Sequence, residues 1–333
     1  MAIKPLLSYN KKQDIIDGLE DFGNGDRSSH IADHANVFMV KGIHRQWKQA
    51  VSFNFSSGPI KSQKLKPLLL EIIKECKQIG LEVVATVCDQ GSANQAVINS
   101  LLKDTHNKCI ENGVQNTFCG FTTDGTDDVI PLYDVPHLFK GIRNNLLTKD
   151  LHFEENGLKK IARWDHIKQF YMLDKMEDVR LCPKLTDGHI LGDKMKKMKV
   201  SAMAQVFSYS VGSLMKRISQ WEIKTEYNLP PEAENTADFL LLMDSLFDSL
   251  NGNSKHGGAG KPLKGGISET SPHEEFWIKT IPTLDKMRFY NAKRKKKVKY
   301  ILPRAINQDC LEIFFRVSEV IVVTMPCLMW RIS

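Results

Sequence analysis

Hydrophobic residues follow two different periods in the first part of the chain. Short runs of β-branched and aromatic residues at 37–40 and 50–55, bounded by polar turns, predict strands of a β-meander. Between 64 and 80 the apolar residues recur at helical spacing, and Gly80 is typical of a helix end. The apolar run 83–87 then predicts a buried strand. Strands, a helix and a buried strand in this order predict a mixed α/β sheet.

The pattern changes near residue 150. Before it, a strand is predicted at 129–134, followed by a helix that opens at Pro136 and continues through Leu147. Beyond it the strand signals fade, and we predict amphipathic helices over 158–173, 194–220 and 233–250. The segment 251–271 is rich in glycine and polar residues, which predicts a flexible loop. This shift indicates an inserted or appended helical domain.

Composition narrows the class of protein. A chain of 333 residues exceeds the usual size of one domain, so two units are expected. No apolar stretch is long enough to cross a bilayer, and no secretory signal is apparent, which favours an intracellular protein without a membrane partner. The seven cysteines include no CxxC pair, so we expect reduced thiols and no zinc finger. A net charge of +7 suits a polyanionic partner.

Acidic residues at two distant places are candidates for chemistry. Asp89 follows the buried strand, so its carboxylate is expected at the strand end. Asp309 and Glu312 share one face if their segment is helical. Acids gathered in this way are typical of a two-metal site for phosphoryl transfer, because Mg²⁺ or Mn²⁺ neutralises the clustered charge. The alternative is that these acids are only solvated. Asp134 with His137 is a further possible pair, although a histidine in a first helical turn more often caps or packs.

Several motifs together resemble one family, the P-element type transposases with the related THAP-domain transposase-derived proteins. The matching stretches occur in the family's order from about Met1 to Phe315: Val37-Phe38-Met39-Val40-Lys41-Gly42 with Trp47-Lys48-Gln49, Val83 to Gly91, Tyr133 to Lys140 with Arg143-Asn144-Asn145, Thr236-Ala237-Asp238-Phe239, and Asn307-Gln308-Asp309. The resemblance therefore covers nearly the whole chain.

The resemblance implies a fold class and domain limits. We expect an α/β, RNase H-like mixed sheet, incomplete because its first strand is missing, interrupted by a mainly α-helical GTP-binding insertion domain. The expected limits are 1–149 for the first part of the RNase H-like domain, 150–290 for the insertion, 291–316 for the returning acidic helix and 317–333 for a divergent tail.

The resemblance also implies an activity and a reason for its loss. The family cuts and joins transposon DNA with an acidic triad that holds divalent metal ions. Asp89 matches the second acid and Glu312 the third, with Asp309 beside it, and the first acid is expected just before Met1. We therefore expect a P-element-like transposase fragment, truncated at both ends and inactive as this chain. The alternative is a non-catalytic domesticated or relic module that binds DNA or GTP.

GTP-binding residues follow from the resemblance position by position. Asp248 and Asn251 suit the base edge of guanine, because a carboxylate accepts both N1–H and N2–H and an amide completes the edge. Phe247 is expected to line that pocket. The other residues at matching spacings are Asp178, Lys184, Lys199, Val200 and Ser208, and the two lysines suit phosphate charge. The stretch around Gly260 and Lys261 is not a Walker-type loop, because its spacing is short and Pro262 follows.

Location and partners are the last expectations. The basic run 293–299 is either a solvated edge or a contact for nucleic acid or nuclear import. By resemblance we expect a nuclear protein that binds GTP, Mg²⁺ or Mn²⁺, and DNA as transposon ends and target. Assembly into homo-oligomers is expected only through segments outside this chain.

Overall fold

The computed structural model describes residues 2–43, 47–192, 195, 199–221, 229–252, 257–258, 260–268, 270–291, 297–298 and 321–324. The chain divides into two compact units, and each is described by itself. Unit 1 comprises residues 1–134 and 305–333, and unit 2 comprises residues 135–304. Among the described helices, none is long and apolar enough to span a membrane.

Unit 1 is built on a seven-stranded sheet with the order β4-β3-β6-β5-β13-β7-β8. Its strands are β3 (Leu19–Asp21), β4 (Arg27–Ile31), β5 (His34–Gly42), β6 (Lys48–Ser56), β7 (Val83–Cys88), β8 (Ile130–Tyr133) and β13 (Ile321–Thr324). A separate hairpin joins β1 (Ser8–Asn10) to β2 (Ile15–Asp17). The strands predicted at 37–40 and 50–55 are present as β5 and β6, which pair antiparallel, but the predicted β-meander is wrong. β3 lies between β4 and β6, so strands that follow one another in the sequence are not all neighbours in the sheet.

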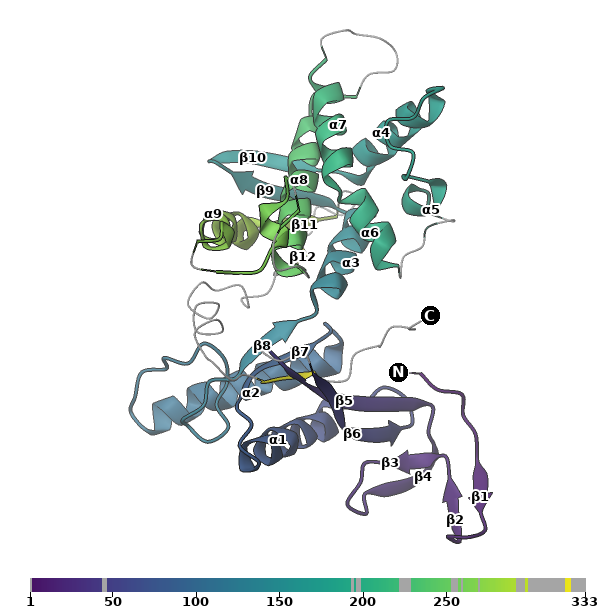
Figure 1. Ribbon diagram of the computed structural model, residues 1–333, viewed down its shortest axis with the longest axis vertical. Helices are drawn as coiled ribbons and strands as arrows, with labels where there is room; N and C mark the ends of the chain where they lie inside the picture. Colours follow the sequence, from purple (N-terminus) through teal and green to yellow (C-terminus); the bar gives the residue numbers. More distant parts are fainter. Residues whose placement is uncertain are drawn as a thin grey trace. The chain divides into compact units, whose positions relative to one another are not determined.

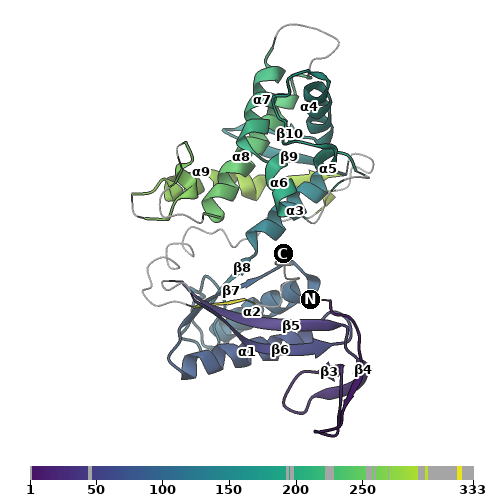
Figure 2. The same ribbon diagram turned by 45° about the vertical axis from the view of Figure 1, so that its right-hand side comes forward.

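Two long helices cover one face of this sheet. α1 (Ser62–Gln78) and α2 (Ser92–Glu111) lie side by side in Figures 1 and 2. Their apolar faces bury residues such as Leu69 and Ile98 in one core with Phe38 and Val40 of β5. β7 is almost wholly buried, as its unbroken apolar run predicts. Asp89 thus follows a rigid strand of the sheet.

The strand between β5 and β7 comes from the far end of the chain. β13, yellow in Figure 1, pairs antiparallel with β5 and parallel with β7. Residues 321–324 lie in the stretch that the sequence predicts to be a divergent tail. The tail prediction overlooks this strand, although the β-branched residues at 321–324 are a local strand signal. The place of the strand between β5 and β7 depends on its partners.

Unit 2 combines helices with a four-stranded sheet of order β10-β9-β11-β12. The strands are β9 (Asp150–Glu155), β10 (Leu158–Ala162), β11 (Arg288–Tyr290) and β12 (Lys297–Val298). The helices are α3 (Val135–Leu146), α4 (Trp164–Met176), α5 (Asp187–Ile190), α6 (Val200–Val206), α7 (Tyr209–Ser219), α8 (Ala233–Leu250), the 3₁₀ helix η1 (Pro262–Lys264) and α9 (His273–Lys286). α7 and α8 run side by side (Figure 2).

Two predicted helices need correction. The prediction of a helix over 158–173 is wrong in its first part, because 158–162 form β10 and the helix starts at Trp164. The decisive signal is Asn156-Gly157, whose positive φ values of 52° and 79° suit a two-residue hairpin turn. The described part of the helix predicted over 194–220 is divided into α6 and α7, because Ser208 caps the start of α7.

A partly buried ion pair ties three elements of unit 2 together. Asp238 of α8 accepts from Lys160 of β10 and from Lys216 of α7, each at 2.6 Å. The Asp238 side chain is only 11 % exposed. Burial raises the pKa of this carboxyl, but the two lysines outweigh burial and hold the pKa below its ordinary value. The ionised form therefore stabilises the fold.

Asp238→Asn should lower the free energy of unfolding by about 1–3 kcal/mol at neutral pH, because both lysines lose a charged acceptor. Since the folded pKa lies below 3.8, the stabilisation is present above that pH and is lost as the pH falls through the folded pKa. Urea unfolding measured from pH 7 to pH 2 should show that the difference in free energy of unfolding between variant and parent becomes smaller in acid. Glu234→Gln, at an exposed carboxylate 3.7 Å from Lys216, is the matched control and should change little. A gap that stays constant with pH would contradict this account.

Candidate functional site

The first candidate, Asp89, lies at the carboxyl end of β7. Its Oδ1 accepts from the backbone N–H of Gly91 at 2.8 Å and from the Asn94 side chain at 2.8 Å. These bonds fix the turn into α2, whose N-cap residue is Gly91. Asp89 therefore shapes the strand-to-helix turn, whatever else its carboxylate does.

The neighbours of Asp89 do not complete a metal site. β8 runs parallel to β7 with Cys88 opposite Tyr133, which brings Asp134 level with Asp89. On the other side, β13 consists of Ile321 to Thr324 and carries no carboxylate. Within the described residues, no three His, Cys, Asp or Glu side chains are placed to hold a metal ion. Asp309 and Glu312 lie outside the described residues. The described residues thus do not provide the set of ligands that a site for two metal ions needs.

Asp89→Ala should destabilise the chain by about 1 kcal/mol, because the α2 turn loses an acceptor for two donors. Asp89→Asn keeps an oxygen at the same position and should retain most of that stability. Denaturant unfolding of the two variants against the parent measures the difference. Equal losses in both variants would show that the negative charge, rather than the acceptor, matters here.

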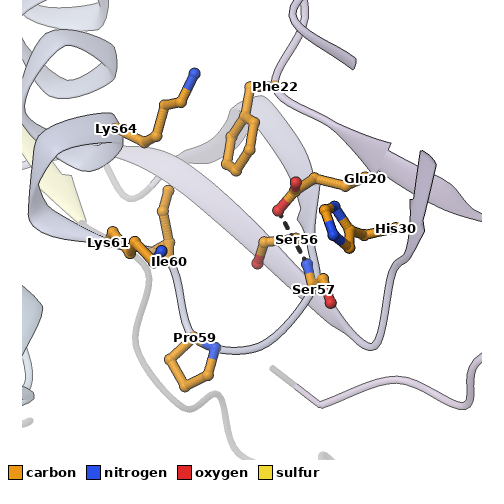
Figure 3. Close-up of a pocket in the computed structure, with 9 residues that line it drawn as sticks. All are labelled: Glu20, Phe22, His30, Ser56, Ser57, Pro59, Ile60, Lys61 and Lys64. Carbon is orange, nitrogen blue, oxygen red and sulfur yellow. Dashed lines mark hydrogen bonds between the residues drawn. The ribbon is translucent and has the colours of Figure 1, made fainter. Parts of the chain in front are cut away.

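A cavity of about 300 Å³ in unit 1 is a second place to consider (Figure 3). Phe22 lines it, with the Lys64 ammonium 5.3 Å from the ring centre. The Glu20 carboxylate accepts from the Ser57 backbone and from Ser28 at 3.1 and 2.8 Å. None of the predicted site residues lines this cavity.

The third candidate is the last turn of α8. Asp244 and Asp248 are one turn apart, and Asn251 follows as the C-cap residue, so the three share one side of the helix. The side chains of Asp244 and Asp248 are 15 % and 13 % exposed. Asn251 donates its backbone N–H to Phe247 at 2.9 Å, which closes the helix. Two nearly buried carboxylates and an exposed amide thus lie together.

A lysine neutralises this acidic face. Lys261 donates to Asp248 Oδ2 at 2.6 Å and lies 3.2 and 3.0 Å from the two oxygens of Asp244. Burial alone would lower the pKa of Lys261, but the two carboxylates outweigh it and raise the pKa above its ordinary value. Lys261 is therefore a full cation in this site.

The backbone around Lys261 is held firmly against α8. Lys261 donates its N–H to Gly258 at 2.9 Å and begins the turn that leads into η1. The ring of His273, 1 % exposed, lies with Nε2 2.9 Å from the Leu263 carbonyl. Gly252 allows the close approach, since a Cβ there would lie 2.8 Å from the Lys264 carbonyl. The described residues of the predicted 251–271 loop thus include a compact turn.

Phe247 lies on α8 itself, and the remaining predicted residues lie on other elements of unit 2. Phe247 packs edge-on against Phe139 of α3, with ring centres 5.1 Å apart. Lys199 occupies the N-cap position of α6 and Val200 begins the helix. α6 contacts α3, which also contacts α8. Ser208 is engaged as the N-cap of α7, where it accepts from Val211.

Asp178 and Lys184 are exposed residues of the segment between α4 and α5. Among the described residues, no hydrogen bond or ion pair joins either of them to Asp248, whereas Phe247, Asp248 and Asn251 lie together at the end of α8. Sequence reasoning missed Asp244 as a member of the site and Lys261 as its partner. The spacing of Asp244, four residues before Asp248, is the available signal for the former. Nothing local in the sequence indicates the ion pairs of Lys261.

Comparison with known proteins identifies the family. Residues 1–102 match the family model of the TNP-like RNase H N-terminal domain, and residues 136–262 match that of the TNP-like GTP-binding insertion domain. The chain belongs to the P-element type transposase family. The predicted family and fold class are confirmed: a mixed α/β chain in which an RNase H-like domain precedes a GTP-binding insertion domain.

Two relatives of this P-element type chain show the extent of the likeness. The transposable element P transposase of Drosophila melanogaster is 26 % identical over 318 residues, which are 85 % of this chain and 38 % of that protein. A solved structure, the Drosophila P element transposase strand transfer complex, matches with a TM-score of 0.69 and 21 % identity, over 95 % of this chain and 63 % of that one. The chain spans less than two thirds of the length of either relative. The domain limits predicted from sequence remain predictions.

Proposed function

We propose that this chain binds GTP through the last turn of α8. The observation that carries the proposal is the acidic face with Asp248 and Asn251, which lies inside the matched GTP-binding insertion domain. A carboxylate that is 13 % exposed and held by a cation is an unusual surface feature. It suits the recognition of a base with two adjacent N–H donors.

Each predicted residue then has a role in holding the nucleotide. The two oxygens of Asp248 accept from N1–H and N2–H of guanine, the Asn251 amide completes the base edge, and Phe247 lies against the base. Lys184 and Lys199 supply positive charge for the phosphates. Asp178, Val200 and Ser208 are proposed as further contacts around the nucleotide.

We also propose that this chain does not cut DNA by itself. The family's strand transfer uses divalent metal ions, which activate the attacking oxygen and stabilise the leaving one. Support for the proposal comes from the sheet, where β13 sets no carboxylate beside Asp89. Glu312 is proposed as the third acid of the ancestral site, with Asp309 beside it. DNA as partner and the nucleus as compartment are proposed from the relation to the P transposase.

Equilibrium titration with a fluorescent GTP analogue, with unlabelled GTP and ATP as competitors, tests the GTP proposal. GTP should displace the analogue at much lower concentration than ATP. Equal displacement by both would reject it. Incubation of the chain with supercoiled DNA and Mn²⁺ tests the second proposal, for which no nicking is expected. Nicking that is lost in Asp89→Asn would show instead that the metal site is complete.

A further inference from the structure

Lys261 contacts the same carboxylate that guanine would need. Its ammonium donates to Asp248 Oδ2 at 2.6 Å, and within the described part of the chain no hydrogen bond reaches the other oxygen, Oδ1. A bidentate contact with guanine uses both oxygens of one carboxylate. The lysine and the base therefore compete for Oδ2.

Asp244 gives the lysine an alternative partner. Both of its oxygens already lie within 3.2 Å of the same ammonium, one helical turn before Asp248. If guanine takes Asp248, Lys261 keeps an ion pair with Asp244 and no buried charge is left alone. An exchange of this kind has a small energetic cost, because the number of charged contacts is nearly conserved.

The surroundings favour motion of the side chain over motion of the loop. The Lys261 side chain is 39 % exposed, whereas its backbone is fixed by the turn to Gly258 and by the contact of His273 with Leu263. The ammonium can thus move between the two carboxylates while the loop stays in place.

We propose that Lys261 is a latch that competes with guanine for Asp248 and lowers the affinity of the GTP site, an inference that rests on the proposed function. In the empty site it occupies Asp248. Guanine replaces it with two N–H donors, and the lysine withdraws to Asp244. Adenine presents an acceptor at N1 and cannot make this replacement, so the latch sets the affinity for guanine nucleotides and not the discrimination against adenine.

The latch predicts that substitutions of Lys261 and of Asp244 change GTP affinity in opposite directions. Lys261→Met removes the competitor and should raise GTP affinity about fivefold to tenfold, as expected for one charged hydrogen bond at a half-exposed site. Asp244→Asn removes the alternative partner, holds the lysine on Asp248 and should lower GTP affinity by a similar factor. In the double variant the lysine is absent, so the loss caused by Asp244→Asn should disappear.

Titration of the full chain with the fluorescent GTP analogue measures all four proteins, and Lys279→Met, at an exposed lysine of α9, controls for the change in net charge. Circular dichroism confirms that each variant is folded. Asp244→Asn keeps Lys261 in place, so it tests the latch even if Lys261→Met fails to fold. Lower GTP affinity in Lys261→Met is the result expected if Lys261 binds a phosphate group of GTP, and it would overturn the latch. Unchanged GTP affinity in Lys261→Met or in Asp244→Asn would also overturn it. If the parent chain binds GTP in those cases, the proposed function stands while the latch fails. If the parent binds no GTP, both fail.

Discussion

Asp248→Asn should reduce GTP affinity by about 10-fold to 100-fold, the largest effect expected for any single change in unit 2. The asparagine amide offers one acceptor and one N–H₂ donor, and the donor meets an N–H of guanine instead of accepting from it. Loss of a charged hydrogen bond and an unsatisfied donor correspond to about 1.5–3 kcal/mol. ATP affinity should change little, so the preference for GTP should collapse.

Xanthosine triphosphate is the matched control for that variant. Xanthine has a carbonyl oxygen where guanine has its 2-amino group, so the asparagine amide can donate to it and accept from N1–H. Asp248→Asn should therefore bind xanthosine triphosphate better than the parent chain does. An unchanged ratio of GTP to ATP affinity would remove Asp248 from the base site, even if the chain binds nucleotides.

Val322→Pro should destabilise unit 1 by about 3 kcal/mol or more, the largest stability effect that we expect. Val322 lies in β13 opposite Lys41 of β5 and Ala85 of β7. Proline has no N–H and is excluded from strands paired on both sides, so the substitution breaks the link between the two halves of the sheet. Hydrogen exchange measured by mass spectrometry should show lost protection in β5 and β7.

Unit 2 provides the internal control for this variant, because each of its described strands pairs with another strand of the same sheet. Protection of β9 and β10 should stay at the parent level. Val322→Thr keeps a β-branched residue with its N–H and should preserve the sheet. Unchanged protection of β5 and β7 in Val322→Pro would mean that β13 does not join them.

Elements with a strong local signal were predicted well. The helix predicted over 233–250 is α8 with the same limits, and the buried strand predicted over 83–87 is β7. Both have apolar patterns that fit one period only. The β9–β10 hairpin was missed, although Asn156-Gly157 indicates it, because the apolar residues beyond Leu158 also fit a helix.

Contacts between residues that are far apart in the chain could not be predicted from the sequence. Asp248 was named from the family pattern, but its ion pair with Lys261 depends on a turn that brings the loop back over α8. The place of β13 depends on partners at the other end of the chain. Such pairings follow from tertiary packing rather than from local propensity, so no window along the sequence contains them.

Binding of GTP, inosine triphosphate and ATP to the unmodified chain tests the central claim most directly. Inosine triphosphate has the N1–H of guanine but lacks the 2-amino group, so it offers Asp248 one donor instead of two. The account predicts that affinity falls from GTP to inosine triphosphate and falls again to ATP. Equal affinity for the three nucleotides would contradict the claim that the last turn of α8 reads guanine.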